Sequence, residues 1–108
     1  MHLAKDVALV LFRIVQESLR NIAKYSEANK AQVSFNLVKR TIVLQIKDDG
    51  MGFDVAEAKR SPGLGIQSMM ERAKLINGEL HIHSEENKGT TIELSFSVPN
   101  MQDDETDM

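Results

Sequence analysis

The N-terminal part of the chain has the hydrophobic spacing of an amphipathic helix. From Asp6 to about Tyr25, apolar residues recur every three or four positions, at Val7, Leu11, Ile14, Val15, Leu19 and Ile22. This spacing places them on one side of a helix, and Asp6 is its predicted N-cap. At about 100° per residue, Glu17, Asn21 and Lys24 lie within about 60° of one another, largely away from the apolar side. The pattern therefore predicts one helix with a buried face and a separate polar face.

Strict alternation of apolar and polar residues follows this helix and predicts two strands. The residues that face one side are Val33, Phe35 and Leu37 in the first strand and Ile42, Leu44 and Ile46 in the second. Lys39-Arg40 lies between the two runs and is the natural turn. The segment is therefore predicted to form an antiparallel hairpin.

The second half of the chain repeats the order of helix and hairpin. Residues 54–62 lack hydrophobic periodicity and contain Ser61-Pro62, so they are predicted to form a loop that could close over a ligand. A second helix is predicted from about Leu64 to Asn77, where Asn77-Gly78 is a stop signal. Its buried face comprises Ile66, Met69, Met70, Ala73 and Ile76. Two alternating strands follow, around residues 80–82 and 92–98, with a turn at residues 87–89.

The predicted order is α-β-β-α-β-β, and the sequence itself contains no internal repeat or linker. Helices on one face of a mostly antiparallel, mixed sheet form a two-layer α/β sandwich, which is an α+β fold. With 108 residues, the chain is predicted to be one domain over residues 1–100. Residues 101–108 are polar, acidic and aperiodic and are predicted to be a disordered tail.

The charge of the chain gives no basic surface for nucleic acid. The formal net charge is −3, and the tail holds four of the acidic residues, which leaves 13 positive and 12 negative side chains in residues 1–100. Direct contact with nucleic acid is therefore not expected. No run approaches the roughly 18 apolar residues of a membrane span, and no signal-peptide pattern occurs. We expect a cytoplasmic domain without membrane contact of its own. The absence of cysteine excludes disulfides and thiolate metal sites.

Two glycine clusters indicate a nucleotide site. The first is Asp48-Asp49-Gly50-Met51-Gly52-Phe53-Asp54, after an apolar strand, and the second is Gly63-Leu64-Gly65-Ile66, at the start of the second helix. Glycine has no Cβ and tolerates positive φ, so such segments let a base or a phosphate approach the backbone. Neither the G-x-x-x-x-G-K-[ST] phosphate loop nor the G-x-G-x-x-G dinucleotide turn is present. Another kind of nucleotide site is therefore required.

Together with these clusters, the helical segment 13–26 and Gly89-Thr90-Thr91 closely resemble the catalytic ATP-binding domain of two-component sensor histidine kinases. That domain has the Bergerat fold, which is shared with gyrase, the mismatch-repair ATPase and the large heat-shock chaperone. The motifs occur in the order of the family, and the resemblance covers residues 6–99. Segments 12–19 and 63–73 are similar to the subgroup of kinases whose response regulators have a helix-turn-helix output domain.

The resemblance implies ATP and Mg²⁺ as cofactors. Asp48 matches the carboxylate that accepts a hydrogen bond from the amine of adenine, which is worth about 1.5–3 kcal/mol and which guanine cannot supply. Asn21 matches the residue whose amide oxygen binds the Mg²⁺ that bridges the phosphates. Lys24 and Tyr25 correspond to residues near the phosphates, although many relatives have histidine in place of Tyr25. Taken alone, Asp48 could instead cap a turn, and the helix face could be solvated surface.

Further roles are assigned by the same resemblance. Glu17 aligns with the residue that polarises the attacking water in the ATP hydrolases of the superfamily, and here it is expected to support Asn21 in catalysis, together with Lys24. Thr90 matches a threonine near the adenine-side water network, and Thr91 is its neighbour. Backbone contacts to the nucleotide are expected from Gly50, Gly52, Gly63, Leu64, Gly65 and Ile66, and the helix that starts near Gly65 directs free N–H groups toward phosphate.

The implied activity is transfer of the γ-phosphoryl of Mg-ATP to a histidine on a helical dimerisation domain, for relay to a response regulator. His81 and His83 are predicted on the solvent side of a strand. They do not resemble that acceptor, which lies on a helix next to an acidic residue. The first strand that commonly precedes the helix in relatives is not recognised. We therefore expect a fragment of a longer sensor kinase that does not autophosphorylate alone. Two alternatives stay open: an ATPase or nucleotide switch, and a nucleotide-binding domain without phosphotransfer.

Overall fold

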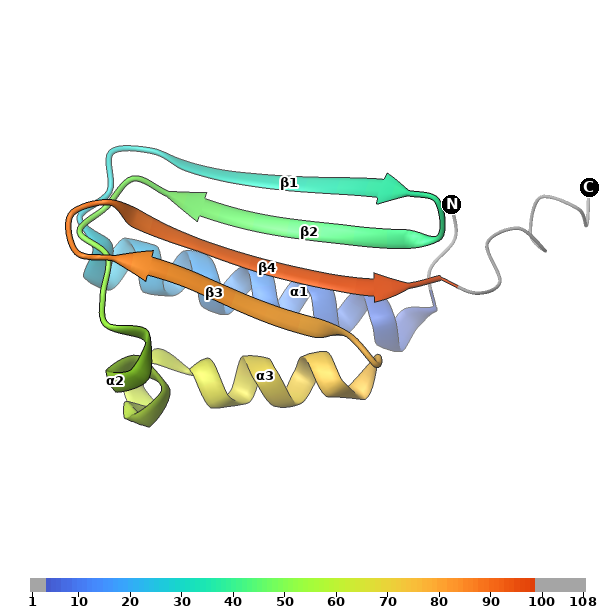
Figure 1. Ribbon diagram of the computed structural model, residues 1–108. Helices are drawn as coiled ribbons and strands as arrows, with labels where there is room; N and C mark the ends of the chain where they lie inside the picture. The colour runs from blue at the N-terminus through green and yellow to red at the C-terminus, as the bar shows by residue number, and fades with distance from the viewer. Residues whose placement is uncertain (1–3, 99–108) are drawn as a thin grey trace, which may run out of the picture.

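The computed structural model describes residues 4–98, which form one sheet with helices on one of its faces (Figure 1). The predicted tail at residues 101–108 lies outside the described residues. The helical elements are α1 (Lys5–Asn21), a π-helical turn (Ile22–Ser26), α2 (Val55–Arg60), a 3₁₀ turn (Pro62–Leu64) and α3 (Ile66–Leu75). The strands are β1 (Ala31–Val38), β2 (Thr41–Asp48), β3 (Glu79–Glu85) and β4 (Gly89–Ser97).

The sheet confirms the predicted fold class. Its strand order is β1-β2-β4-β3, and all three pairings among the described residues are antiparallel. The first hairpin turns at Lys39 and Arg40, between the paired residues Val38 and Thr41, and Lys39 has a φ of 58°. Two hairpins therefore lie side by side, with β2 and β4 in the centre. Figure 1 shows α1 and α3 on the same side of this sheet, which makes two layers.

The core lies between these two layers. Its most deeply buried side chains include Ile14 of α1, Met69 of α3 and Leu94 of β4. β1 is an edge strand, and its inward-facing Val33, Phe35 and Leu37 pair with Ile46, Leu44 and Ile42 of β2. The β2 residues are buried, whereas the β1 residues remain 41–46% exposed. The helices therefore cover the centre of the sheet better than its β1 edge.

Three details of the predicted helices were wrong. Asp6 is not the N-cap, because α1 begins at Lys5 after Ala4, and the Asp6 carboxylate accepts a hydrogen bond from the neighbouring N–H of Val7 at 3.0 Å. Residues 54–62 are not a plain loop but contain α2. The second helix begins at Ile66 rather than near Leu64, since the positive φ of Gly65 separates it from the 3₁₀ turn.

The missed helix α2 has a capped N-terminus and little hydrophobic surface turned inward. The carboxylate of Asp54 accepts a hydrogen bond from the N–H of Glu57 at 3.1 Å and caps the helix. Ala58 is its one buried residue, so six residues with a single inward side chain leave no hydrophobic period to detect. The signal was the spacing of Asp54 and Glu57, which is that of a capping box.

The first helix continues past Asn21 but changes its winding. Residues 22–26 form a π-helical turn, which ends at Ser26 before Glu27 enters the left-handed region with a φ of 52°. The carbonyl of Ser26 accepts a hydrogen bond from the N–H of Met51 at 2.8 Å. The end of the first helical segment is thereby attached to the first glycine cluster.

Candidate functional site

A cavity of about 400 Å³ lies between α1, strands β2 and β4, and the two glycine clusters. Its volume falls within the range of about 300–1,000 Å³ that is typical of small-molecule sites. The predicted site residues that line it are Asn21, Tyr25, Asp48, Gly52, Gly63, Leu64, Ile66 and Thr90. Those that do not line it are Glu17, Lys24, Gly50, Gly65 and Thr91. The fold thus brings residues from four distant segments to one cavity.

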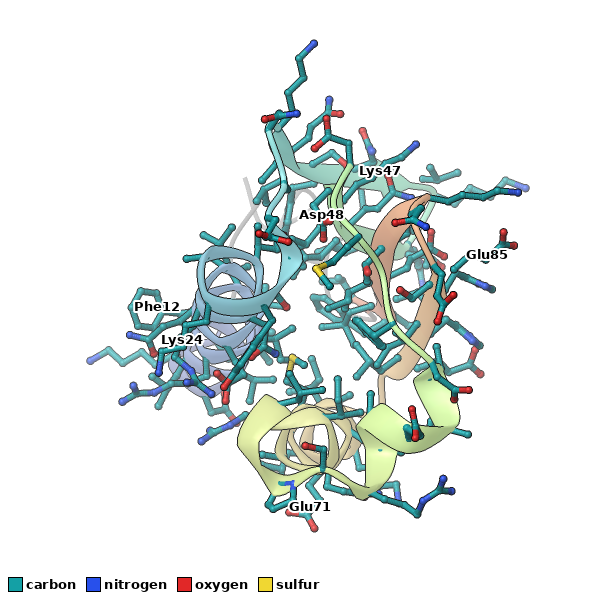
Figure 2. All side chains as sticks on the ribbon, turned by 90° about the vertical axis from the view of Figure 1, so that its left-hand side faces the viewer. Phe12, Lys24, Lys47, Asp48, Glu71 and Glu85 are labelled. Carbon is teal, nitrogen blue, oxygen red and sulfur yellow. The ribbon has the colours of Figure 1, made fainter. Side chains whose placement is uncertain are left out.

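Asp48 lines the part of the cavity beside the first glycine cluster, which we call the Asp48 end. It is the last residue of β2, it is 7% exposed, and its Oδ1 accepts a hydrogen bond from the N–H of Gly50 at 2.8 Å. Figure 2 shows Asp48 on the side of the sheet that faces α1. Thr90 lies directly opposite Asp48 in the pairing of β2 with β4, and it is also buried. A carboxylate and a hydroxyl therefore share a wall of the cavity that is otherwise largely apolar.

The first glycine cluster folds tightly over this end. Gly50 packs against Ser26, and a Cβ at Gly50 would overlap the Ser26 carbonyl. Gly52 has a φ of 67°, and a Cβ there would overlap the carbonyl of Glu85 in β3. The carbonyl of Met51 accepts a hydrogen bond from the N–H of Asn87 at 2.6 Å. Gly50 thus acts by allowing close backbone packing behind the cavity, not by lining it.

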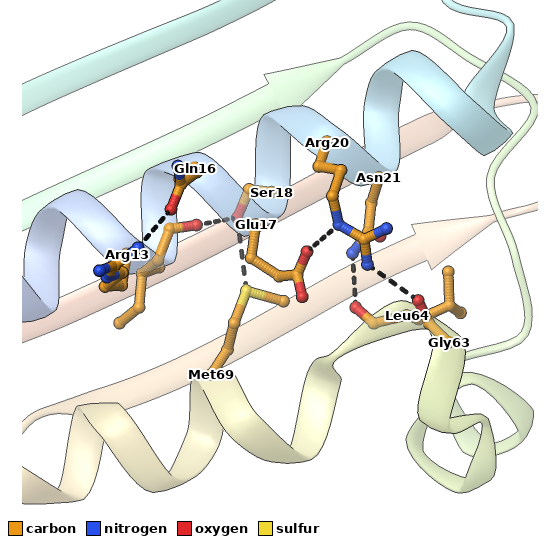
Figure 3. A network of polar contacts seen from close by, with 10 residues as sticks. Arg13, Gln16, Glu17, Ser18, Arg20, Asn21, Gly63, Leu64 and Met69 are labelled. Atoms are coloured by element: carbon orange, nitrogen blue, oxygen red, sulfur yellow. Dashed lines mark hydrogen bonds and ion pairs between the residues drawn. The ribbon is translucent and has the colours of Figure 1, made fainter.

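Asn21 lines the part of the cavity beside the second glycine cluster, which we call the Asn21 end, where Leu64 approaches α1 (Figure 3). Its Nδ2 donates a hydrogen bond to the carbonyl of Leu64 at 2.6 Å. Its Oδ1 is buried and is the one such side-chain atom among the described residues that lacks a hydrogen-bond partner. A buried acceptor without a donor is costly, and an amide oxygen is a ligand type that Mg²⁺ accepts. The Oδ1 atom of Asn21 is therefore a suitable ligand for a divalent cation.

Arg20 and Glu17 hold the same glycine cluster from outside the cavity. Arg20 Nε donates to Glu17 Oε2 at 2.5 Å, and Arg20 Nη2 donates to the carbonyl of Gly63 at 3.0 Å (Figure 3). The hydrogen bond that Arg20 donates to the Glu17 carboxylate raises the pKa of Arg20. The carboxylate of Glu17 also packs against Gly65, where a Cβ would overlap it. Glu17 therefore lines an open groove between α1 and α3 rather than the cavity.

Lys24 and Thr91 are placed away from the cavity for reasons of backbone geometry. Lys24 is exposed and lies on the side of α1 away from the sheet (Figure 2). It sits in the π-helical turn, where each residue advances by less than the 100° assumed from the sequence. Thr91 follows Thr90 in β4, so its side chain points to the opposite face of the sheet.

The apolar wall of the cavity was missed as part of the site. Ile22, Met51 and Phe53 line it, as do Ile46 and Ile92, which face each other across β2 and β4. The sequence pattern assigned Ile46 and Ile92 to the core, because one face of the sheet supplies both the core and the cavity wall. The available signal was their position, two residues before Asp48 and two after Thr90.

Tyr25 lies at the cavity, whereas His81 and His83 lie on the exposed side of β3. Tyr25 lines the cavity, is 48% exposed, and its hydroxyl lies 3.9 Å from where a Cβ of Gly63 would be. His81 and His83 are exposed on β3, as predicted. Residues 4–98 contain no cluster of three or more His, Asp or Glu side chains that could bind a metal ion.

Among the described residues, no helix is both long and apolar enough to cross a membrane.

Comparisons with known proteins identify the family of the chain. The family described as "Histidine kinase-, DNA gyrase B-, and HSP90-like ATPase" matches residues 6–100. The oxygen sensor histidine kinase NreB of Staphylococcus carnosus (strain TM300) is 36% identical over 93 residues, which are 86% of this chain and 27% of NreB. The chain thus spans about a quarter of the length of this relative.

Solved structures show the same fold. The histidine kinase domain of the blue-light activated histidine kinase from Erythrobacter litoralis EL346 has a TM-score of 0.75 at 15% identity, over 91% of this chain and 48% of that one. The Acinetobacter baumannii histidine kinase AdeS has a TM-score of 0.70 at 20% identity, over 82% and 45% of the two chains. With its fold, its glycine clusters and the family match over residues 6–100, the chain belongs to the family of histidine kinase-, DNA gyrase B- and HSP90-like ATPases.

Proposed function

We propose that this domain binds Mg-ATP in the cavity between Asp48 and Asn21 and donates the γ-phosphoryl to a histidine on a helical dimerisation domain. The phosphoryl group would then pass to a response regulator, of the kind with a helix-turn-helix output domain. Because the relatives that match are sensor histidine kinases, we assign this domain to the cytoplasmic part of a sensor kinase. Without a helical domain that carries the acceptor histidine, this domain would not autophosphorylate.

One observation carries the proposal: Asp48 and Asn21, 27 positions apart in the sequence, line the same cavity. At the Asp48 end, a buried carboxylate can accept a hydrogen bond from the adenine amine, between the apolar side chains that would flank a flat base. At the other end, the unpaired Oδ1 of Asn21 would hold Mg²⁺. Magnesium neutralises charge on the phosphates of the nucleotide.

The residues of the chain would act by binding and orienting. Asn21 links two tasks, because Nδ2 holds the carbonyl of Leu64 while Oδ1 is left for the cation. The N–H groups at the start of α3, after Gly65, would favour phosphate near the second glycine cluster. Tyr25 lines the cavity on the same side. Catalysis of this kind depends on position and charge rather than on covalent chemistry by the domain.

The placement of Glu17 favours phosphotransfer over hydrolysis. Glu17 pairs with Arg20 and packs against Gly65, outside the cavity. It is therefore engaged by protein groups rather than free to activate water. Glu17 and Lys24 would contribute only when the helical domain brings the acceptor histidine to this side of α1. We expect very slow ATP hydrolysis by the domain alone, and rapid turnover would favour an ATPase instead.

The test is calorimetric binding of Mg-ATP to the domain and to two variants. Asp48→Asn should weaken binding by about 10- to 100-fold, since a charge-assisted hydrogen bond is lost. Asp6→Asn, which changes an exposed carboxylate far from the cavity, is the matched control and should bind like the wild type. Unchanged affinity of Asp48→Asn would remove Asp48 from the adenine role.

The metal role of Asn21 is tested separately. Asn21→Ala should lose the part of the ATP affinity that depends on Mg²⁺ and should not phosphorylate a supplied helical domain. Gln16→Ala, on the same helix but outside the cavity, is the control. A variant at Asn21 that still transfers phosphate at the wild-type rate would refute the assignment.

A further inference from the structure

We propose that Ser84 is a positioning residue of the nucleotide site, which fixes Thr90 and the first glycine cluster at its adenine end. This inference rests on the proposed function, since the cavity is taken to hold adenine near Asp48. Ser84 itself does not line the cavity. It lies in β3, one strand beyond Thr90, and acts through the groups that do.

The sheet register aligns the three polar side chains in a row. Asp48 of β2 lies opposite Thr90 of β4, and Thr90 lies opposite Ser84 of β3. Directly opposite residues of neighbouring strands project to the same face, with Cβ atoms about 4.5–5.5 Å apart. Ser84 Oγ is 2.7 Å from Thr90 Oγ1. The Asp48 carboxylate therefore lies on the strand next to the paired hydroxyls of Thr90 and Ser84. Of these two residues, Thr90 lines the cavity.

Ser84 also holds the backbone of the first glycine cluster. The N–H of Phe53 donates to Ser84 Oγ at 2.8 Å, and Phe53 lines the cavity. Ser84 is the one side chain among the described residues for which a hydrogen bond links this cluster to β3. The neighbouring contact of Asn87 N–H with the Met51 carbonyl is made by backbone alone. The same hydroxyl therefore connects two parts of the cavity wall.

The hydrogen-bond donors and acceptors around Ser84 determine what the Thr90 hydroxyl can offer to a ligand. Ser84 Oγ carries one proton, accepts from Phe53, and has two possible acceptors, Thr90 Oγ1 and the Gly89 carbonyl at 3.3 Å. If Ser84 donates to Thr90, the proton of Thr90 is left to donate into the cavity. If Ser84 donates to Gly89, Thr90 donates to Ser84 and presents only lone pairs. In both cases Ser84 uses part of the hydrogen-bonding capacity of Thr90 and restricts the rotation of the Thr90 hydroxyl.

A matched pair of variants isolates the hydroxyl. Ser84→Thr keeps it, and Ser84→Val has nearly the same shape without it, while both residues suit a strand. We expect Ser84→Thr to bind Mg-ATP within about twofold of the wild type and Ser84→Val to bind about fivefold more weakly or worse. The loss should be the same for ADP without Mg²⁺, because Ser84 acts at the adenine end. Ser84→Ala, with thermal melting of all variants, replaces Ser84→Val if the latter is not folded.

Coupling to Thr90 distinguishes positioning from general loss of structure. The combined Ser84→Val and Thr90→Val changes should weaken binding by less than the product of the two single effects, since each single change already breaks the hydroxyl pair. Equal affinity of Ser84→Val and Ser84→Thr, or purely multiplicative effects, would overturn the proposal. Absence of ATP binding by the wild type would instead overturn the proposed function, so the two failures are distinguishable.

Discussion

The two ends of the cavity are built in different ways. The Asp48 end is formed by strand register and backbone contacts: Asp48 and Thr90 are paired residues of central strands, and the backbone of Met51 bonds to Ser26 and Asn87. The Asn21 end is formed by side chains of α1 that reach the carbonyls of residues 63 and 64. The first end therefore depends mainly on the folded backbone of the sheet and its neighbours. The second can separate without a break in the sheet.

This difference matches the two tasks in the proposed function. A base needs a fixed wall and one directional polar contact, which a sheet supplies well. Phosphates must be enclosed for transfer and released afterwards, and contacts made by the partly exposed Arg20 and Asn21 can be exchanged at low cost. Substitutions at the Asp48 end should therefore destabilise the fold and the site together. Substitutions at the Asn21 end should affect the site more than the fold.

The largest effect is expected for Gly52→Ala. Gly52 has a φ of 67°, and a Cβ would overlap the Glu85 carbonyl, so the first glycine cluster cannot stay against β3. We expect a loss of more than about 2 kcal/mol in the free energy of unfolding, measured with urea. Gly63→Ala is the control for stability, because the space around Gly63 is open, and it should change the free energy by less than about 1 kcal/mol. Equal losses for the two variants would contradict the comparison.

An intermediate effect is expected for Arg20→Met. It removes the hydrogen bond to the Gly63 carbonyl and the pair with Glu17, both on the surface, so the unfolding free energy should fall by less than about 1 kcal/mol. Hydrogen exchange of residues 61–66 should nevertheless become faster, and Mg-ATP should bind several-fold more weakly. Arg13→Met is the matched control, since Arg13 contacts Gln16 on the same helix and not the glycine cluster. If Arg20→Met made hydrogen exchange faster across the whole sheet, the Asn21 end would not open independently of the sheet, and the comparison would be contradicted.

The same difference explains how much could be predicted from the sequence. Alternation in residues 33–46 and 92–98 identified both hairpins, because strand patterns are local and the hydrophobic face is continuous. The glycine clusters and Asp48 were recognised as motifs, and the structure places most of these residues around one cavity. Contacts between α1 and residues 63–65 could not be predicted, since they join side chains to carbonyls 43 positions away and leave no periodic signal.

Departures from regular geometry explain why the positions of other site residues could not be predicted. The helical wheel put Lys24 on the face of Asn21, but it assumed 100° per residue through a segment that is π-helical. The wheel did place Glu17 near Asn21, yet it could not show that Arg20 and Gly65 would engage the Glu17 carboxylate outside the cavity. Ser84 was missed because an alternating strand pattern does not distinguish a serine on its inner face, and its contact with Phe53 appears only when the first glycine cluster is folded onto β3.

The smallest effect is expected from Asp49, which fastens the Asp48 end to the segment after the first helix. Its Oδ1 accepts hydrogen bonds from the N–H groups of Lys30 and Asn29, both at 2.9 Å. The hydrogen bond from Lys30 is the main cause that lowers the pKa of Asp49. A carboxyl whose pKa is lower in the folded state stabilises the fold above its unfolded pKa of about 3.9, and this stabilisation is lost as the pH falls through the folded pKa.

The stabilisation by Asp49 should therefore depend on pH but hardly on salt. Urea unfolding of the wild type and of Asp49→Asn should differ most near pH 7, and the difference should shrink as the pH falls below about 4. Because the main cause is a hydrogen bond rather than a distant charge, about 0.5 M salt should leave most of the difference at pH 7. If the difference in unfolding free energy grows on acidification or disappears in salt, Asp49 acts as a surface charge. It would then not stabilise the Asp48 end through its hydrogen bonds with Lys30 and Asn29.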